Sequence, residues 1–216
     1  MRNITLALLT AFMFSSCVGV VQEILIRRDG SGTVSLEYRF SRELETLGKL
    51  DGNENWPPLP VGKADFERTV ARIPGLSLHS FTTKTAGQDI VNQVKLSFSS
   101  TEALVHLLNG SAGGSGQRAS LVREGNRNRL TLGWSGGGDT DPELLSLLGA
   151  AMEGYILEFG LTLPQTPELR ILDGNGRARE TPPAGTVTVQ GKRAGFSVPM
   201  AGLLSSPEPF TLEILW

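Results

Sequence analysis

Residues 22–40 read QEILIRRDGSGTVSLEYRF and predict the repeating unit of this chain. Residues 22–28 have the pattern of a short strand, and Asp29-Gly30-Ser31-Gly32 supplies the residues of a hairpin turn. Apolar side chains then occupy every second position of a returning strand, namely Val34, Leu36, Tyr38 and Phe40. Ser41 begins a predicted helix that carries three leucines. The stretch therefore predicts a strand-strand-helix unit.

The same order of elements recurs twice. Residues 76–85 and 94–98 predict a second hairpin, and Ser99-Ser100-Thr101-Glu102 is a capping box for a helix that Asn109-Gly110 should end. Residues 118–134 predict a third hairpin, followed by a helix from Pro142. Each returning strand ends in an aromatic residue followed by serine. We call these three residues, Phe40, Phe98 and Trp134, the strand-end aromatics.

The remaining sequence patterns, a helix over 64–73 and strands from residue 155, indicate the fold class. Phe66, Val70 and Ile73 share one face of a predicted helix over 64–73, which Pro74-Gly75 ends. From residue 155 the chain is mostly alternating strand pattern, up to Trp216 at the last position. We predict an α+β fold, with an antiparallel sheet of strand-strand-helix units over 22–153, helices on one face, and a β-rich section over 154–216. Whether that section is a separate domain stays open.

The N-terminus has the layout of an export signal. Arg2 precedes an apolar run from Ile4 to Phe14, then two serines and Cys17, which is the only cysteine of the chain. A spanning helix needs about 20 apolar residues, so this run is too short to be a permanent anchor. We predict a signal peptide over 1–16 and a tether over 17–21.

The residues Phe14-Ser15-Ser16-Cys17 resemble the lipobox of bacterial lipoproteins. This resemblance implies diacylglyceryl transfer to the Cys17 sulfur, cleavage before Cys17, and a protein held in the cell envelope by its acyl chains. Two or three acyl chains give stable anchoring, because each buried CH₂ group contributes about 0.8 kcal/mol. The residue after Cys17 is not Asp, which in Gram-negative sorting implies the outer membrane.

Composition excludes several classes of function. The chain has 20 basic and 22 acidic side chains, a net charge of −2, so it has no excess of positive charge for binding nucleic acid. One cysteine and two histidines exclude a disulfide framework and a cysteine-rich zinc site. The aspartates at positions 29 and 173 lie in Gly- and Asn-rich segments that lack a complete set of calcium ligands, so we interpret them as turns. We expect no metal and no cofactor.

One motif suggests catalysis. Gly133-Trp134-Ser135-Gly136-Gly137 fits the Gly-x-Ser-x-Gly pattern of a hydrolase nucleophile elbow. Such an elbow needs a histidine later in the chain, but His79 and His106 both precede Ser135. Ser135 also follows a strand-end aromatic, as Ser41 and Ser99 do. A strand-exit turn is therefore the preferred interpretation, and a serine hydrolase is a remote alternative.

The order of these elements, with matches such as DGSGTV (29–34) and LTLP (161–164), resembles the LppM-type lipoprotein domain of bacteria. That resemblance implies an envelope domain without assigned catalytic residues. The leading hypothesis is a non-enzymatic, membrane-anchored lipoprotein that binds or supports an unknown envelope partner. The alternative is a carrier of lipids or amphiphiles, in which the strand-end aromatics line an apolar cavity.

Overall fold

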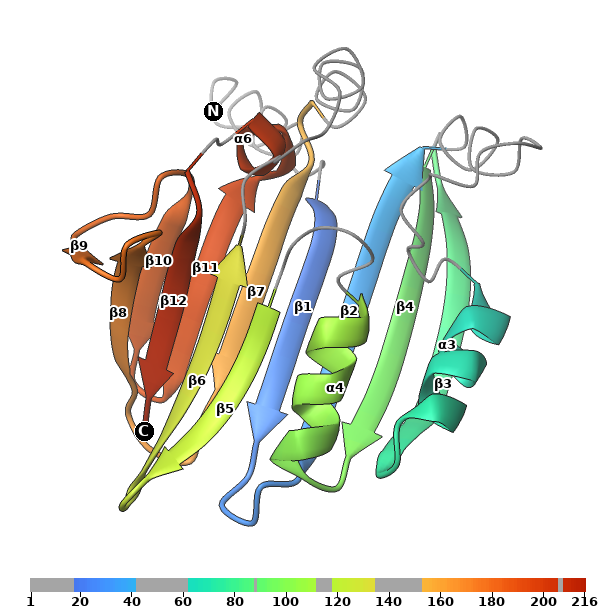
Figure 1. The fold of residues 1–216 in the computed structure, drawn as a ribbon. Helices are drawn as coiled ribbons and strands as arrows, with labels where there is room; N and C mark the ends of the chain where they lie inside the picture. The colour runs from blue at the N-terminus through green and yellow to red at the C-terminus, as the bar shows by residue number, and fades with distance from the viewer. Residues whose placement is uncertain (1–17, 42–61, 88, 112–117, 135–152, 206–207) are drawn as a thin grey trace, which may run out of the picture.

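The computed structural model describes residues 18–41, 62–87, 89–111, 118–134, 153–205 and 208–216 (Figure 1). Within these residues strands dominate and form two sheets, while the helices are few and short. The predicted signal peptide, Cys17, Ser135 and the two helices expected after Ser41 and from Pro142 lie outside the described residues.

Seven strands form the larger sheet, in the spatial order β10-β11-β7-β1-β2-β4-β3. Their bounds are Val18–Ile26 for β1, Gly32–Ser41 for β2, Leu76–Ala86 for β3, Asp89–Phe98 for β4, Ile156–Thr162 for β7, Thr186–Gln190 for β10 and Arg193–Pro199 for β11. The β1–β2 and β3–β4 pairs are antiparallel hairpins, as predicted. The first strand of the chain, β1, is the central strand of this sheet.

Five strands form the smaller sheet, in the order β5-β6-β12-β8-β9. Their bounds are Arg118–Glu124 for β5, Arg127–Trp134 for β6, Glu168–Asp173 for β8, Ala178–Arg179 for β9 and Phe210–Leu215 for β12. The third predicted hairpin, β5–β6, is confirmed, but it belongs to this second sheet. A chain-terminal strand, β12, is its central strand.

Among the described residues, the smaller sheet and the helices α3 (Lys63–Arg72) and α4 (Thr101–Ser111) lie on one face of the larger sheet (Figure 1). The smaller sheet lies against the β7, β11 and β10 half, and α4 and α3 cover the β2, β4 and β3 half. A single cluster of buried side chains runs through both halves, from Phe66 on α3 to Phe196 on β11. The short helix α6 (Met200–Ser205) follows β11. The fold is thus rich in β-strands, and helices are a minor part of its described residues.

The alternation that predicted the strands matches the buried face. Val34 and Leu36 on β2, and Leu130 and Leu132 on β6, are all at most 5% exposed. On α3, Phe66 is buried while Val70 and Ile73 pack against the same core, as the helical spacing predicts. Burial of these apolar faces is the main stabilising contribution to the fold.

The β-rich section over 154–216, whose separateness the sequence left open, is not set apart in the structure, because β7 pairs in parallel with β1 and β12 pairs with β6. Two predictions about organisation were wrong. The strand-strand-helix units do not build one antiparallel sheet, because the third hairpin joins the other sheet. The helix α4 continues through Asn109-Gly110 to Ser111. Local alternation shows which face is buried but contains no information about which strand is the neighbour.

Candidate anchoring site

The start of β1 is the described position next to the predicted lipidation residue, Cys17. The sequence predicted a tether over 17–21, but β1 already begins at Val18 and pairs with Ile156 of β7. Residues 18–21 are therefore part of the central strand rather than a linker. In the sequence, only Val18 separates Cys17 from Gly19.

Gly19 is buried and closely surrounded. A Cβ atom at this position would lie 2.8 Å from Met200 Sδ and 2.9 Å from Tyr155 Cβ. The Met200 amide donates a 2.9 Å hydrogen bond to the Tyr155 carbonyl, which ties α6 to the start of β7. The Tyr155 hydroxyl donates to Asp89 Oδ1 at 3.4 Å. The start of β1 is thus closely flanked by Met200 of α6 and by Tyr155, the residue before β7.

The sequence did not single out Gly19, Tyr155 and Met200 as a group. Tyr155 opens the alternating pattern that predicted this strand, and it is half-buried. For Gly19 and Met200 the sequence contains no signal, because their proximity depends on the long-range pairing of β1 with β7.

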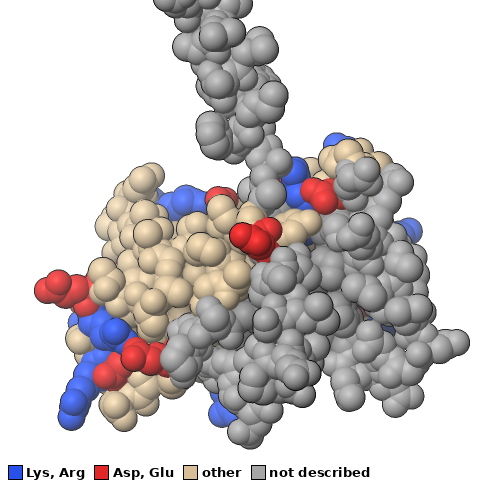
Figure 2. All heavy atoms as spheres, turned by 90° about the horizontal axis from the view of Figure 1, so that it is seen from above, with Lys and Arg blue, Asp and Glu red and all other residues tan. Residues whose placement is uncertain are grey.

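Charges at this end of the molecule are of both signs. Figure 2, which views the molecule from above Figure 1, shows basic and acidic side chains scattered over an otherwise uncharged surface. Three charged residues lie at the strand ends on this side of the molecule: Asp89 begins β4, Arg118 begins β5 and Asp173 ends β8. Juxtamembrane attraction to anionic lipids needs a cluster of about 4–8 basic residues. Such a cluster is not seen on the part of this end formed by described residues.

The strand-end aromatics do not surround a common cavity. Phe40 pairs with Ile90, whereas Phe98 pairs with Gly32, so the two lie at opposite ends of the β2–β4 ladder, about 26 Å apart. The side chain of Phe40 lies outside the described residues. The Phe98 ring covers Gly32, where a Cβ atom would lie 2.3 Å from it, and is 2% exposed.

Trp134 belongs to an aromatic cluster between the two sheets. Its ring stacks on Phe210 with centroids 5.1 Å apart and lies 5.3 Å from the ring of Phe196 on β11. Trp134 is 6% exposed. This strand-end aromatic is mainly part of the packed core, and one edge of it reaches the hollow described next.

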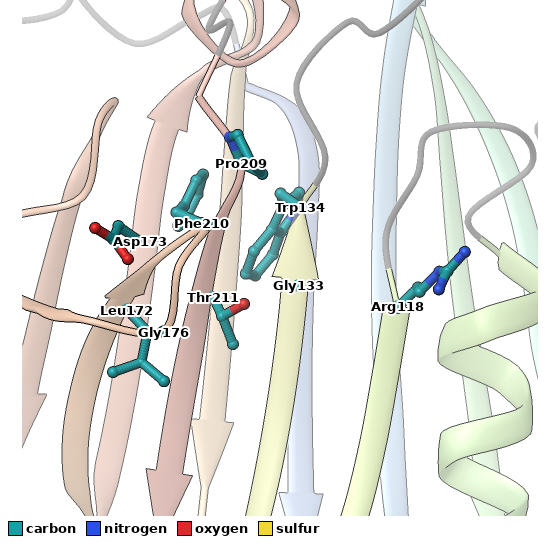
Figure 3. A pocket seen from close by; sticks show the side chains of 10 residues that line it. Arg118, Gly133, Trp134, Leu172, Asp173, Gly176, Pro209, Phe210 and Thr211 are labelled. Atoms are coloured by element: carbon teal, nitrogen blue, oxygen red, sulfur yellow. The ribbon is translucent and has the colours of Figure 1, made fainter.

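A shallow hollow of about 440 Å³ lies where β6 and β8 end and β12 begins. Figure 3 shows Arg118 on one side and Asp173 on the other, with Trp134, Phe210 and Thr211 between them. The Asp173 carboxylate accepts hydrogen bonds from the backbone amides of Arg177 and Asn175, and the Arg177 bond is the main reason why its pKa is lowered. The hollow therefore presents hydrogen-bonding groups without an acid-base pair poised for proton transfer.

Hydrogen bonds to the carboxylates of Asp29 and Asp173 support the interpretation of both segments as turns. Asp29 Oδ1 accepts bonds from the Ser31 hydroxyl at 2.8 Å and the Ser31 amide at 3.0 Å, and the hydroxyl bond is the largest cause of its lowered pKa. Within the described ranges, no three His, Cys, Asp or Glu side chains lie close enough to share a metal ion. No helix in the described part of the chain is long and apolar enough to cross a bilayer.

The structure brings one histidine next to a hydroxyl group. His79 Nε2 and Ser97 Oγ are 2.8 Å apart on the exposed outer face of the larger sheet. Among the described residues no carboxylate hydrogen-bonds His79, so the orienting group of a catalytic triad is missing. His106 is exposed on α4, and Ser135 lies outside the described residues.

Comparison with known proteins gives one similar structure. No family model matches the chain, and no curated protein matches it. The chain is similar to the NMR structure of the folded domain of Mycobacterium tuberculosis LppM, with 13% sequence identity and a TM-score of 0.49 over 93% of this chain and 91% of that chain.

Proposed function

We propose that this chain is a non-enzymatic lipoprotein of the bacterial cell envelope, anchored through acyl chains on Cys17, whose domain binds or supports an envelope partner. The observation that carries the proposal is the start of β1 at Val18, one residue after Cys17. The anchor and the centre of the larger sheet are then joined without a linker. A folded domain held this way stays at the bilayer surface and cannot explore the space around it.

The packing around Gly19 supports this arrangement. Met200 and Tyr155 enclose Gly19, two residues after the proposed anchor, so the strand that follows Cys17 is held within the fold. On the described part of this end both charge signs occur (Figure 2), so the described side chains form no basic cluster that would attract anionic lipid. Membrane association therefore depends on the acyl chains.

The test compares acylation and detergent partitioning of the full-length chain and its Cys17→Ser variant, both expressed in a bacterium. We expect the unchanged chain to enter the detergent phase and to show an acylated, cleaved N-terminus by mass spectrometry. We expect Cys17→Ser to lose acylation and to leave the detergent phase. The double variant Cys17→Ser, Thr82→Cys is the matched control, because its cysteine on the exposed edge strand β3 should not restore acylation. Acylation of Cys17→Ser would contradict the proposal.

The proposal that the chain is not an enzyme is tested separately. The purified chain should not react with a fluorophosphonate probe, and Ser135→Ala should leave any hydrolysis of ester substrates unchanged. Labelling that requires Ser135 would contradict this part of the proposal and favour the hydrolase alternative.

A further inference from the structure

Edges of β-sheets expose unpaired backbone groups, and three of the four edges here are protected. On β5, the Asn109 side chain of α4 accepts a 2.7 Å bond from the Ala119 amide and donates a 3.0 Å bond to its carbonyl. The edge strand β3 has a bulge between Leu78 and Ser80. The third edge, β9, is only two residues long.

The fourth edge, β10, has none of these protections. Its sequence, TVTVQ over Thr186–Gln190, contains no charged residue and no proline. All five residues pair with β11 in a regular register, and within the described residues β10 makes no other strand pairing. Val189 is 44% exposed. A regular, uncharged edge with high β-propensity is suited to pairing with a further strand.

The surrounding sequence is nearly symmetric about Thr188. Residues 185–191 read GTVTVQG, with a glycine of positive φ at each end, 81° for Gly185 and 57° for Gly191. In an antiparallel self-pair centred on Thr188, Val187 lies opposite Val189 of the second copy and Gly185 lies opposite Gly191. Valine then meets valine on one face, and no like charges oppose each other.

We propose that β10 pairs in antiparallel fashion with β10 of a second copy of this chain, which joins the two larger sheets into one. The exposed Val189 side chains are then covered by Val187 of the opposite copy. A hollow of about 340 Å³, lined by these two valines and by Leu169 and Ile171 of β8, lies next to β10. The second copy closes the open side of the sandwich where this hollow lies.

The symmetry of this pair constrains its placement. The two copies are related by a twofold axis perpendicular to the joined sheet. The N-terminal ends of the two β1 strands therefore lie at opposite ends of that sheet. Two such copies anchored in one bilayer therefore hold their joined sheet along the membrane surface. The proposal itself does not depend on anchoring, so it is tested without the acyl chains.

The first test is sedimentation of the predicted mature chain, residues 17–216, carrying Cys17→Ser, which contains every described residue. We expect a dimer, and we expect Val189→Lys to be a monomer because the lysine opposes an apolar side chain at the interface. Thr82→Lys on the edge strand β3 is the matched control and should remain a dimer. Circular dichroism checks that both variants are folded. A monomeric parent up to about 1 mM, or a dimer that survives Val189→Lys, overturns the proposal.

A second measurement tests the register. In the Cys17→Ser background, Thr188→Cys places the only thiol of each copy beside its counterpart, within the Cβ separation of about 4.5–5.5 Å for opposed residues. Mild oxidation should crosslink Thr188→Cys faster than Thr82→Cys by at least about tenfold. Equal crosslinking rates contradict pairing centred on Thr188.

Discussion

Replacing Phe196 by alanine tests whether the two sheets form one cooperative unit. Phe196 is 2% exposed on β11 of the larger sheet, and its ring lies 5.3 Å from Trp134 and 5.7 Å from Phe210, both on the smaller sheet. Truncating a buried phenylalanine costs about 3–5 kcal/mol. Each lost aromatic pair accounts for about 0.5–1.5 kcal/mol beyond buried area, so the loss should be clearly above the lower limit of that range.

The assay is equilibrium unfolding in urea, followed by both tryptophan fluorescence and circular dichroism. We expect Phe196→Ala to lower the free energy of unfolding by about 4 kcal/mol. The dependence of that free energy on urea concentration should be unchanged. Thermal unfolding should move down by about 8–16 °C for a chain of this length. Val122→Ala is the control, because Val122 is 51% exposed on β5 and its truncation should cost less than about 1 kcal/mol.

Two results would refute this reasoning. A loss below about 1 kcal/mol would mean that the aromatic cluster does not hold the sheets together. Two separate transitions, of which only one responds to Phe196→Ala, would mean that the sheets unfold independently.

Three further predictions follow from side chains with defined partners. Asn109→Ala should lower the free energy of unfolding by about 1–2 kcal/mol in urea titration, because the Ala119 amide and carbonyl lose their partner while alanine favours the helix. Burial raises the pKa of Tyr38 to about 12, so its contribution to stability is present below about pH 10 and is lost as pH rises toward 12. Tyr38→Phe should remove that loss, and an identical alkaline profile would contradict it. The lowered pKa of Asp173 contributes stability above about pH 4 that disappears as pH falls, so acid unfolding of Asp173→Asn should depend less on pH.

The sequence was informative wherever structure is local. The turn at Asp29–Gly32 and the alternation along β2 predicted the first hairpin, because both signals act between residues close in the chain. The pairing of β1 with β7 joins residues that lie 137 or 138 positions apart in the chain, and neither strand contains a signal for the other. This is why residues 18–21 looked like a tether. The β5–β6 hairpin was predicted for the same local reason as the first, but its place in the second sheet was not.

The candidate site divides in the same way. Cys17 stands out because the lipobox is a contiguous motif, whereas Gly19, Tyr155 and Met200 meet only through the parallel β1–β7 ladder. The cavity hypothesis treated Phe40 and Phe98 as equivalent ends of equivalent strands. Their strands, β2 and β4, are antiparallel neighbours, and this places the two residues at opposite ends of the ladder.

The central position of β1 has a mechanical consequence. Seven residue pairs join β1 to β2 and seven join it to β7, so a pull on its N-terminal end loads two hydrogen-bonded ladders in shear. A strand at a sheet edge can be peeled off one pair at a time, but β1 can slide only if both ladders rupture together. The lifetime of a protein under force is set by its unfolding rate, which this arrangement lowers. A pulling force on the N-terminus therefore acts on the central strand of the larger sheet.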